Sequence, residues 1–396
     1  MKPSQILPCL VGVASGACTQ NQHVVRNGTE LSLGGEPWRP VGGNAYWLGL
    51  DENIVPPPPG EPFDARTNSS YPTRGRITEA MEIIRAMGGT MLRVHTLGSN
   101  IGNPLSLLPG NRVINEKAFE TMDWVVSEAR RHGVRLMVPL VDHYDYYHGG
   151  KYNFLRWAGY NLTFAENPED PLIMEFYYNQ SIVTDFKWYI ERLLTHVNPL
   201  TNLTYAEDPT IFAYESGNEL YGDKWGDKNC PTEWVRDIGR FVKDLAPKKL
   251  YVDGTYGINA DHFAVEEVDI FSDHFYGPDV ARLQEGIDLV ADAGRTYFAG
   301  EYDWTGGSGD DLNEFFQVLR ESPIATGDAF WSLFGRNSPN CQQWVNHTDG
   351  FTLSYGNPEN SPELTSQIQL VRQHLTLVST GEDIGSDDPL PDVPCV

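Results

Sequence analysis

The sequence has few cysteines and little positive charge. Its 29 Lys and Arg residues face 54 Asp and Glu residues, so the formal net charge is −25 at pH 7. A nucleic-acid backbone or an anionic membrane surface would repel such a chain unless it carried a local basic patch, and the sequence shows none. The five cysteines form no Cys/His cluster with the spacing of a zinc site. We therefore expect no nucleic-acid partner, no membrane partner and no zinc site of that kind.

Long apolar runs are also missing. The run Ile6 to Ala17 follows Lys2 and is too short to span a bilayer, so it resembles a secretory signal peptide. We expect residues 1–20 to be this signal and the mature chain to be secreted and extracellular. Six Asn-x-Ser/Thr tripeptides agree with a secreted glycoprotein, and they begin at Asn27, Asn68, Asn161, Asn179, Asn202 and Asn346.

The cysteines fit the same compartment. Cys9 lies inside the expected signal, which leaves Cys18 at its edge and Cys230, Cys341 and Cys395 to pair. An oxidising compartment predicts one disulfide, and its pairing stays open.

The chain is long and rich in aromatic residues. With 396 residues and 40% hydrophobic content, it can bury a large core in one barrel-sized domain or in two smaller ones. The 10 Trp and 19 Tyr residues can fill that core, and they can also line a groove that stacks on sugar rings. Composition alone favours the core.

Apolar strands alternate with amphipathic helices along the chain. A continuous apolar run such as Val134 to Val141 is typical of a parallel strand that helices cover on both faces. Eight strands are expected, at Pro40 to Leu50, Thr90 to His95, Val134 to Val141, Ile211 to Ser216, Leu250 to Asp253, Ile270 to Phe275, Thr296 to Ala299 and Ala329 to Leu333. This number of strands in a chain of this length predicts an α/β fold with a single (β/α)8 barrel, rather than a doubly wound open sheet.

Helical periodicity and helix-terminating residues mark the segments between these strands. Helices are expected at Ile77 to Met87, Asn115 to His132, Tyr177 to Val197, Pro231 to Leu245, Val280 to Ala293 and Leu312 to Glu321. A small hairpin is expected at Leu31 to Trp38, and four consecutive prolines exclude regular structure from the loop Val55 to Tyr71. We expect residues 21–380 to form one catalytic domain, followed by an acidic, Pro- and Asp-rich tail, 381–396, that Cys395 could pin.

Polar residues follow several expected strands, and in a barrel they would meet at one face. Glu219 and Glu301 each end an apolar strand shortly after a glycine. Gly217 would let the backbone turn, so that Asn218 and Glu219 project at the edge of the barrel. A pair of carboxylates about 5 to 5.5 Å apart would serve retaining glycoside hydrolysis, whereas a wider gap would indicate inversion.

These residues also have purely structural interpretations. Glu219 could be a first-turn charge of a following helix. Glu215 lies on the same strand face and competes with it, although Glu215 would lie deeper. Arg93 could pair with a core acid, or it could keep a nucleophilic glutamate ionised. The aromatic loop His143 to Tyr147 is more typical of a sugar-binding rim than of a core.

The ordered set of strand-end residues resembles the active-site pattern of glycoside hydrolase family 5, a family of retaining (β/α)8 glycosidases. The resemblance extends from about Gly42 to Phe334, and the surrounding segments YWL and DPTIFAYESGNEL are most similar to the fungal and plant endo-β-1,4-mannanases. The residues that carry it are Arg93 in LRVH, His143 in VDHYD, Asn218 and Glu219 in SGNEL, His274 and Tyr276 in DHFYG, Glu301 in AGEYDW and Trp331 in FWSLF.

The resemblance implies that Glu219 is the acid/base and Glu301 the nucleophile. Arg93 and Tyr276 would support Glu301, and His274 would tune Glu219. The remaining substrate contacts that it implies are Asn218 on the sugar 2-hydroxyl, Trp331 as the floor of the subsite before the cleavage point, and His143, Trp47 and Trp304. No metal or organic cofactor is required.

The proposed roles set expectations for the two carboxyl groups. Glu219 has to be protonated when the leaving group departs, so its pKa should be raised. Glu301 has to be charged to attack, so its ionised form should be favoured. Many mannanases carry an Asn-Asn-Trp-Asp-like stretch where this chain has Asp142 to Asp145, DHYD, so the sugar contacts there are expected to differ.

Our first hypothesis is a secreted, monomeric endo-β-1,4-mannanase that cleaves a polysaccharide or oligosaccharide by double displacement. An exo-acting β-mannosidase or a β-glucanase is the alternative on the same fold, because the loops Pro56 to Tyr71 and Tyr146 to Pro171 could close one end of the groove. A non-catalytic carbohydrate-binding barrel is a third hypothesis. The presence of both Glu219 and Glu301 argues against it, since a binding relic would need neither.

Overall fold

The computed structural model describes residues 19–54, 57, 59–95, 97–336, 341, 343–345, 347–385 and 388–395, without the side chains of residues 325 and 326. Residues 1–18 of the expected signal peptide, with Cys9 and Cys18, lie outside the described residues, as does the Asn346 sequon. Within these ranges, no helix combines the length and the apolar character that crossing a membrane requires.

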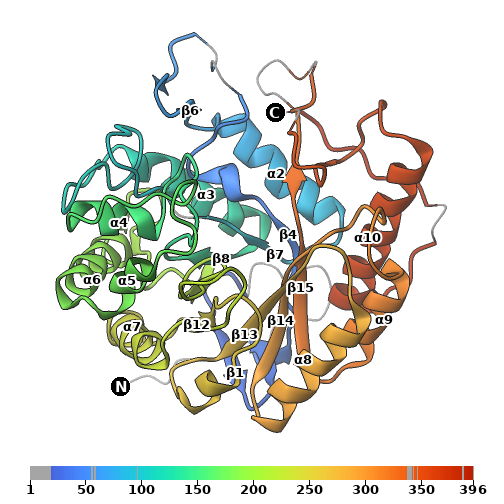
Figure 1. Ribbon diagram of the computed structural model, residues 1–396. Helices are drawn as coiled ribbons and strands as arrows, with labels where there is room; N and C mark the ends of the chain where they lie inside the picture. The colour runs from blue at the N-terminus through green and yellow to red at the C-terminus, as the bar shows by residue number, and fades with distance from the viewer. Residues whose placement is uncertain are drawn as a thin grey trace, which may run out of the picture.

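Eight parallel strands close into a barrel at the centre of the molecule, and helices surround it (Figure 1). Each strand pairs with the next one along the chain, and the last strand closes on the first through Ala329 opposite Gly42. The predicted (β/α)8 barrel is therefore confirmed. Its strands are β4 (Val41–Asn44), β7 (Met91–Arg93), β8 (Arg135–Pro139), β11 (Ile211–Glu215), β12 (Leu250–Asp253), β13 (Ile270–Phe275), β14 (Thr296–Tyr302) and β15 (Ala325–Phe330).

The helices lie between the strands and cover the outside of the barrel. Helix α3 ends where Gly133 takes a left-handed φ of 69° and donates its N–H to the carbonyls of Ala129 and Arg130. The helices are α2 (Arg74–Ala86), α3 (Ala118–His132), α4 (Lys151–Trp157), α5 (Glu175–Tyr178), α6 (Gln180–Leu194), α7 (Thr232–Leu245), α8 (Val280–Asp292), α9 (Leu312–Glu321) and α10 (Pro362–Thr380). Short 3₁₀ helices occur at η1 (Tyr46–Leu48), η2 (Pro171–Met174) and η3 (Ala260–Ala264).

Several predicted elements are shorter than expected, and two of them show the physical reason. The run Pro40 to Leu50 is not one strand, because β4 ends at Asn44 and the chain turns into η1. The helix expected from Tyr177 to Val197 begins only at Gln180, because the side chain of Asn179 caps α6 by accepting the N–H of Ser181. Helices α4 and α10 were not predicted.

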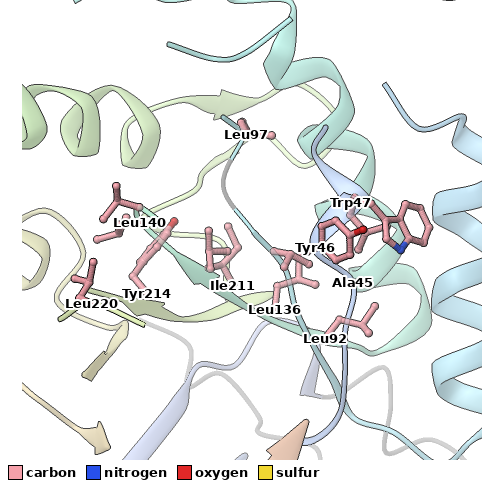
Figure 2. Close-up of a cluster of buried hydrophobic side chains, with 14 of the residues drawn as sticks. Ala45, Tyr46, Trp47, Leu92, Leu97, Leu136, Leu140, Ile211, Tyr214 and Leu220 are labelled. Carbon is pink, nitrogen blue, oxygen red and sulfur yellow. The ribbon is translucent and has the colours of Figure 1, made fainter. Parts of the chain in front are cut away.

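A layer of apolar side chains packs between the barrel and its helices. Leu92, Leu136 and Ile211 come from the neighbouring strands β7, β8 and β11, and Figure 2 shows them close to Tyr46 and Trp47 of η1.

Small sheets complete the fold at both ends of the barrel. The sheet of β1 (Val24–Asn27), β2 (Glu30–Leu33) and β3 (Glu36–Pro37) includes the expected hairpin, and Val24 and Leu31 pack with Met91 and Met137 of the barrel interior. The other short pairs are β5 (Phe63–Asp64) with β6 (Ser69–Ser70), β9 (Val197–Asn198) with β10 (Leu203–Thr204), and β16 (Leu333–Phe334) with β17 (Leu353–Ser354).

The C-terminal tail is tied back to the body of the chain. A disulfide joins Cys341 to Cys395, with 5.8 Å between their Cα atoms. The hydroxyl of Tyr355 donates to the Pro391 carbonyl at 2.9 Å. The predicted disulfide is therefore present, and Cys230 is a free, buried thiol.

Candidate active site

The chain leaves β11 in a short, tightly held segment that carries Glu219. The N–H of Asn218 donates to the Val141 carbonyl at 2.7 Å, and the N–H of Leu220 donates to the Gly254 carbonyl at 2.8 Å. Glu219, between these two anchors, has a left-handed φ of 49°, a conformation that costs a non-glycine residue about 1–3 kcal/mol. The left-handed conformation in this segment therefore lies at Glu219, whereas Gly217 has no positive φ.

Position 254 requires glycine, because the backbone of Gly217 approaches it closely. A Cβ on Gly254 would lie 1.7 Å from the carbonyl oxygen of Gly217, so any side chain would push the segment before Glu219. The position of Glu219 depends on this contact between β11 and the chain that follows β12.

Arg93, at the end of β7, connects four polar partners in the barrel mouth, and one of them is Asn44, whose Oδ1 accepts from the guanidinium at 3.1 Å. Its guanidinium is 0% exposed and donates to Glu215 Oε2, Glu301 Oε1 and Asn218 Oδ1, each at 2.8 Å. Arg93 therefore pairs with the core acid Glu215, as one interpretation required, and it also pairs with Glu301.

Glu301 lies on β14, and both of its carboxylate oxygens accept hydrogen bonds. Arg93 donates to Oε1, and the Tyr276 hydroxyl donates to Oε2. Burial raises the pKa of Glu301 above its usual range, and the positive charges of His274 and Arg93 offset this effect only in part. The negative charge of Glu219 raises the pKa of Glu301 further.

Glu219 is held by two donors from different parts of the barrel. Nδ1 of His274 lies 2.8 Å from Oε1, and the hydroxyl of Tyr144 donates to Oε2 at 2.5 Å. Burial alone would raise the pKa of Glu219, but the hydrogen bond and charge of His274, together with the Tyr144 hydroxyl, bring it below its usual range. The pKa directions of Glu219 and Glu301 are thus the reverse of those predicted.

His274 lies between the two glutamates. Its Nδ1 is 2.8 Å from Glu219 and 3.5 Å from Glu301. Burial lowers the pKa of His274, but the negative charges of Glu301 and Glu219 outweigh it, so the net pKa is raised. The imidazolium form of His274 is therefore favoured between two carboxylates.

The two glutamates are close enough to act on the same atom. One carboxylate oxygen of Glu219, one of Glu301 and one ring nitrogen of His274 all lie within 4.8 Å of one another. The spacing matches retaining glycosidases, whose carboxyl groups are about 5 to 5.5 Å apart, and not inverting ones, whose gap is about 6.5 to 9.5 Å.

A second group with metal-like spacing consists of His95, Asp142 and His148, whose ligand atoms also lie within 4.8 Å of one another. Nε2 of His148 lies 2.6 Å from Asp142 Oδ2, at hydrogen-bonding distance. These three residues are buried, and they form a polar network beside the cavity.

These residues open into a cavity of about 520 Å³, a size typical of small-molecule sites. Trp331 forms part of its wall and stacks on Tyr46 at 5.2 Å between centroids and 10° between planes. The indole N–H of Trp331 donates to Asp349 at 2.8 Å, which fixes the ring. The cavity is lined by Tyr46, Glu52, His95, Asp142, Tyr144, Tyr146, Tyr147, His148, Asn218, Glu219, Trp225, Tyr256, Tyr276, Glu301, Trp331, His347, Asp349 and Phe351.

Three predicted substrate contacts do not line this cavity. Trp47 is 1% exposed in the core, where Arg76 stacks on it and its indole N–H donates to the Leu333 carbonyl. Trp304 is also 1% exposed, and its indole N–H donates to the Phe351 carbonyl. Trp47 lies on η1 instead of the predicted strand, and both indoles are satisfied inside the protein.

His143 is the third correction. It is 0% exposed and stacks on Tyr221, with 3.3 Å between ring centroids. Its Nδ1 accepts the N–H of Tyr221 at 3.3 Å. Its neighbours Asp142 and Tyr144 face the cavity instead.

Several cavity residues were not predicted individually. The aromatic loop His143 to Tyr147 did indicate a rim, and Tyr144, Tyr146 and Tyr147 line the cavity. Trp225, which is 54% exposed, comes from a loop without periodicity, so no local signal marked it.

The sequence matches a known family over most of its length. Residues 22–276 match the family described as GH family 5 beta-mannosidase-like. This segment contains Arg93, Asn218, Glu219 and His274, whereas Glu301 lies beyond it.

Curated relatives are plant proteins. The chain is 32% identical over 292 residues to "Mannan endo-1,4-beta-mannosidase 2" of Oryza sativa subsp. japonica, covering 72% of this chain and 59% of that protein. It is 32% identical over 236 residues to "Mannan endo-1,4-beta-mannosidase 2" of Arabidopsis thaliana, covering 59% of this chain and 49% of the relative. The matched region thus spans about half of the length of these two relatives.

Solved structures share the fold at lower identity. The endo-beta-1,4-mannanase of Thermotoga petrophila superposes with a TM-score of 0.70 at 23% identity, covering 89% of this chain and 79% of that one. The endo-1,4-beta-mannanase of Rhizomucor miehei gives a TM-score of 0.69 at 18% identity, covering 89% and 99%. At these identities the likeness establishes the barrel fold alone.

Proposed function

The chain belongs to glycoside hydrolase family 5, in its β-mannosidase-like branch, and we propose that it is a retaining endo-β-1,4-mannanase. The single observation that carries the reaction type is the approach of Glu219 and Glu301, with carboxylate oxygens within 4.8 Å across the cavity. This spacing leaves no room for the water that an inverting mechanism places between its carboxyl groups.

In the proposed first step, a carboxylate oxygen of Glu301 attacks the anomeric carbon. The bond to the leaving oxygen breaks, and that oxygen takes a proton from Glu219. Arg93 and Tyr276 each donate to Glu301, which holds its oxygens in place and stabilises its charge until the covalent bond forms.

The proton for that step has a source within hydrogen-bonding distance. The favoured imidazolium of His274 lies 2.8 Å from Glu219 Oε1, so transfer across this contact gives a neutral imidazole and a protonated Glu219. As Glu301 becomes an ester, its charge disappears, and one of the two charges that hold the proton on His274 is lost. In the second step Glu219 takes a proton from water, the hydroxyl oxygen attacks the anomeric carbon, and the ester bond to Glu301 breaks.

Mannan is proposed as the substrate because the two plant relatives reported above carry that activity in their names. The cavity suits a neutral polysaccharide, since it combines the aromatic faces of Trp331, Trp225 and Tyr256 with polar side chains. We further propose that the chain acts as a secreted monomer. The Cys341–Cys395 disulfide supports an oxidising compartment.

The test is a product profile on mannan, cellulose and short manno-oligosaccharides. Chain shortening of mannan to mixed oligomers, with little action on cellulose, is the expected result. Release of mannose alone would contradict endo action, and preference for cellulose would contradict the mannan assignment.

The roles of the two glutamates are tested separately. Glu219→Ala and Glu301→Ala should each abolish sugar release, and only Glu301→Ala should prevent labelling by a fluorinated mannoside trap. Glu285→Ala, an exposed position on α8, is the matched control and should keep full activity. Full activity in either glutamate variant would refute the assignment.

A further inference from the structure

Tyr144 is the unexpected contact in the catalytic centre. It lies in the loop between β8 and α4, 75 residues from Glu219 in sequence, and its hydroxyl donates to Glu219 Oε2 at 2.5 Å. The side chain is buried and lines the cavity. Its hydroxyl therefore occupies a site beside the group that has to exchange protons with substrate and water.

A hydrogen bond of the backbone and packing of the ring fix the orientation of Tyr144. Its backbone N–H donates to Asp142 Oδ1 at 3.0 Å, which holds the loop in a tight turn. Its ring meets Phe164 edge to face, with centroids 5.0 Å apart at 84°, and Trp225 lies 6.0 Å away. The hydroxyl is thus aimed at Glu219 by packing that does not depend on the hydrogen bond.

Glu219 has no free carboxylate oxygen in this arrangement, because His274 occupies Oε1 and Tyr144 occupies Oε2. We propose that Tyr144 is a positioning residue that holds Glu219 in its ionised form, ready to act as a base, and that it opposes the protonated form with which Glu219 protonates a leaving group. The inference rests on the proposed glycosidase function and adds a residue outside the predicted site.

The two catalytic steps make opposite demands on this contact. In the first step Glu219 gives a proton to the leaving oxygen, so a donor on Oε2 opposes the protonated form that is needed. In the second step Glu219 accepts a proton from water as the oxygen of that water attacks the anomeric carbon, so the same donor stabilises the starting carboxylate. Tyr144 thus supports the ionised form with which the second step begins and opposes the protonated form that the first step needs.

Other groups around Glu219 also influence its proton. His274 from β13 and Arg93 from β7 favour the carboxylate, whereas Glu301 from β14 opposes it. Further hydroxyls face it from Tyr146, Tyr221, Tyr256 and Tyr276. Among the described residues, only Tyr144 and His274 donate a side-chain hydrogen bond to the Glu219 carboxylate. Tyr144 is therefore the contact whose removal changes Glu219 without removing a formal charge.

The experiment compares wild type with Tyr144→Phe, which deletes the hydroxyl and keeps the ring against Phe164. On a manno-oligosaccharide, where departure of the leaving group needs a proton, the basic limb of the kcat/KM profile should move to higher pH by about one unit. On a dinitrophenyl β-mannoside, whose leaving group needs no proton, the basic limb should not move. A shift on both substrates, or on neither, overturns the proposal.

Two further variants complete the test. Tyr355→Phe removes a buried hydroxyl that donates to the Pro391 carbonyl away from the cavity, and its profile should match wild type. Incorporation of 3-fluorotyrosine at position 144 keeps the shape and makes the hydroxyl a stronger donor, so the basic limb should move to lower pH. This variant decides the question if Tyr144→Phe unfolds. A wild-type enzyme inactive on every mannoside would instead refute the proposed function.

Discussion

Replacing Arg93 with methionine removes the one cation that two buried carboxylates share. Arg93 is fully buried and lies 2.8 Å from both Glu215 and Glu301. Removing one partner of a buried ion pair costs about 3–5 kcal/mol in the free energy of unfolding. Because Arg93→Met leaves Glu215 without its cation and Glu301 with only His274 beside it, we expect a loss near the upper end of this range.

The same substitution has a separate effect on activity. An opposite charge at this distance lowers a carboxyl pKa by about 1–3 units. The pKa of Glu301, already raised by burial, should therefore rise by that amount once Arg93 is gone. In the proposed mechanism Glu301 has to be ionised to attack, so the acidic limb of kcat/KM moves to higher pH, and activity below it falls about tenfold for each unit.

Urea unfolding measures the first effect, and the pH profile of kcat/KM on a manno-oligosaccharide measures the second. The matched control is Arg76→Met, because Arg76 is also buried and pairs with Asp51, but it stacks on Trp47 outside the cavity. The control should lose stability and keep the acidic limb of wild type. If Arg93→Met is folded and its acidic limb also stays in place, the reasoning about Glu301 is wrong.

Three further predictions test other parts of the structure. Gly254→Ala should lower kcat and cost about 1–3 kcal/mol in urea unfolding, because its Cβ would displace Gly217; unchanged kcat would contradict this. Trp225→Ala should raise KM about two- to tenfold with little loss of stability, whereas Trp47→Ala should lower the free energy of unfolding by about 3–5 kcal/mol. Steady-state kinetics measures the first effect and urea unfolding the second. The opposite pattern would place Trp47 in the substrate site and Trp225 in the core. Cys395→Ser opens the Cys341–Cys395 loop, whose sequence separation is 54, and should lower the free energy of unfolding by about 4 kcal/mol by the chain-entropy relation. Urea unfolding of wild type and variant, each with and without reductant, measures this loss. Reductant should weaken wild type alone, and an effect of reductant on the variant would point to another cause.

The barrel could be predicted because several of its strands, such as β7, β11 and β12, are short, largely apolar runs that end at a polar residue. β12 and β13 have the predicted bounds, since a polar or glycine residue follows Asp253 and Phe275 closely. The first strand was predicted too long, because its apolar residues continue into η1, and burial on all sides looks the same in a strand and in a 3₁₀ turn.

The convergence of Arg93, Glu219 and Glu301 could be predicted because a barrel brings strand ends together whatever their separation in sequence. The direction of an individual ring could not. Trp47 and His143 belong to the right segments but point into the core, because one extra turn or one residue of register sends a side chain to the other side. The contact between Tyr144 and Glu219 joins two loops, and it exists only once the tertiary structure has formed.

The Arg93 network also reports on the state of the barrel. Arg93, Glu215 and Glu301 come from β7, β11 and β14, and no two of these strands are neighbours in the sheet. A partly formed sheet could hold any one of the three strands and still leave the ion pairs open. These ion pairs therefore require the closed barrel, and no part of the barrel can form them alone. Recovery of activity after unfolding should report when the barrel has closed.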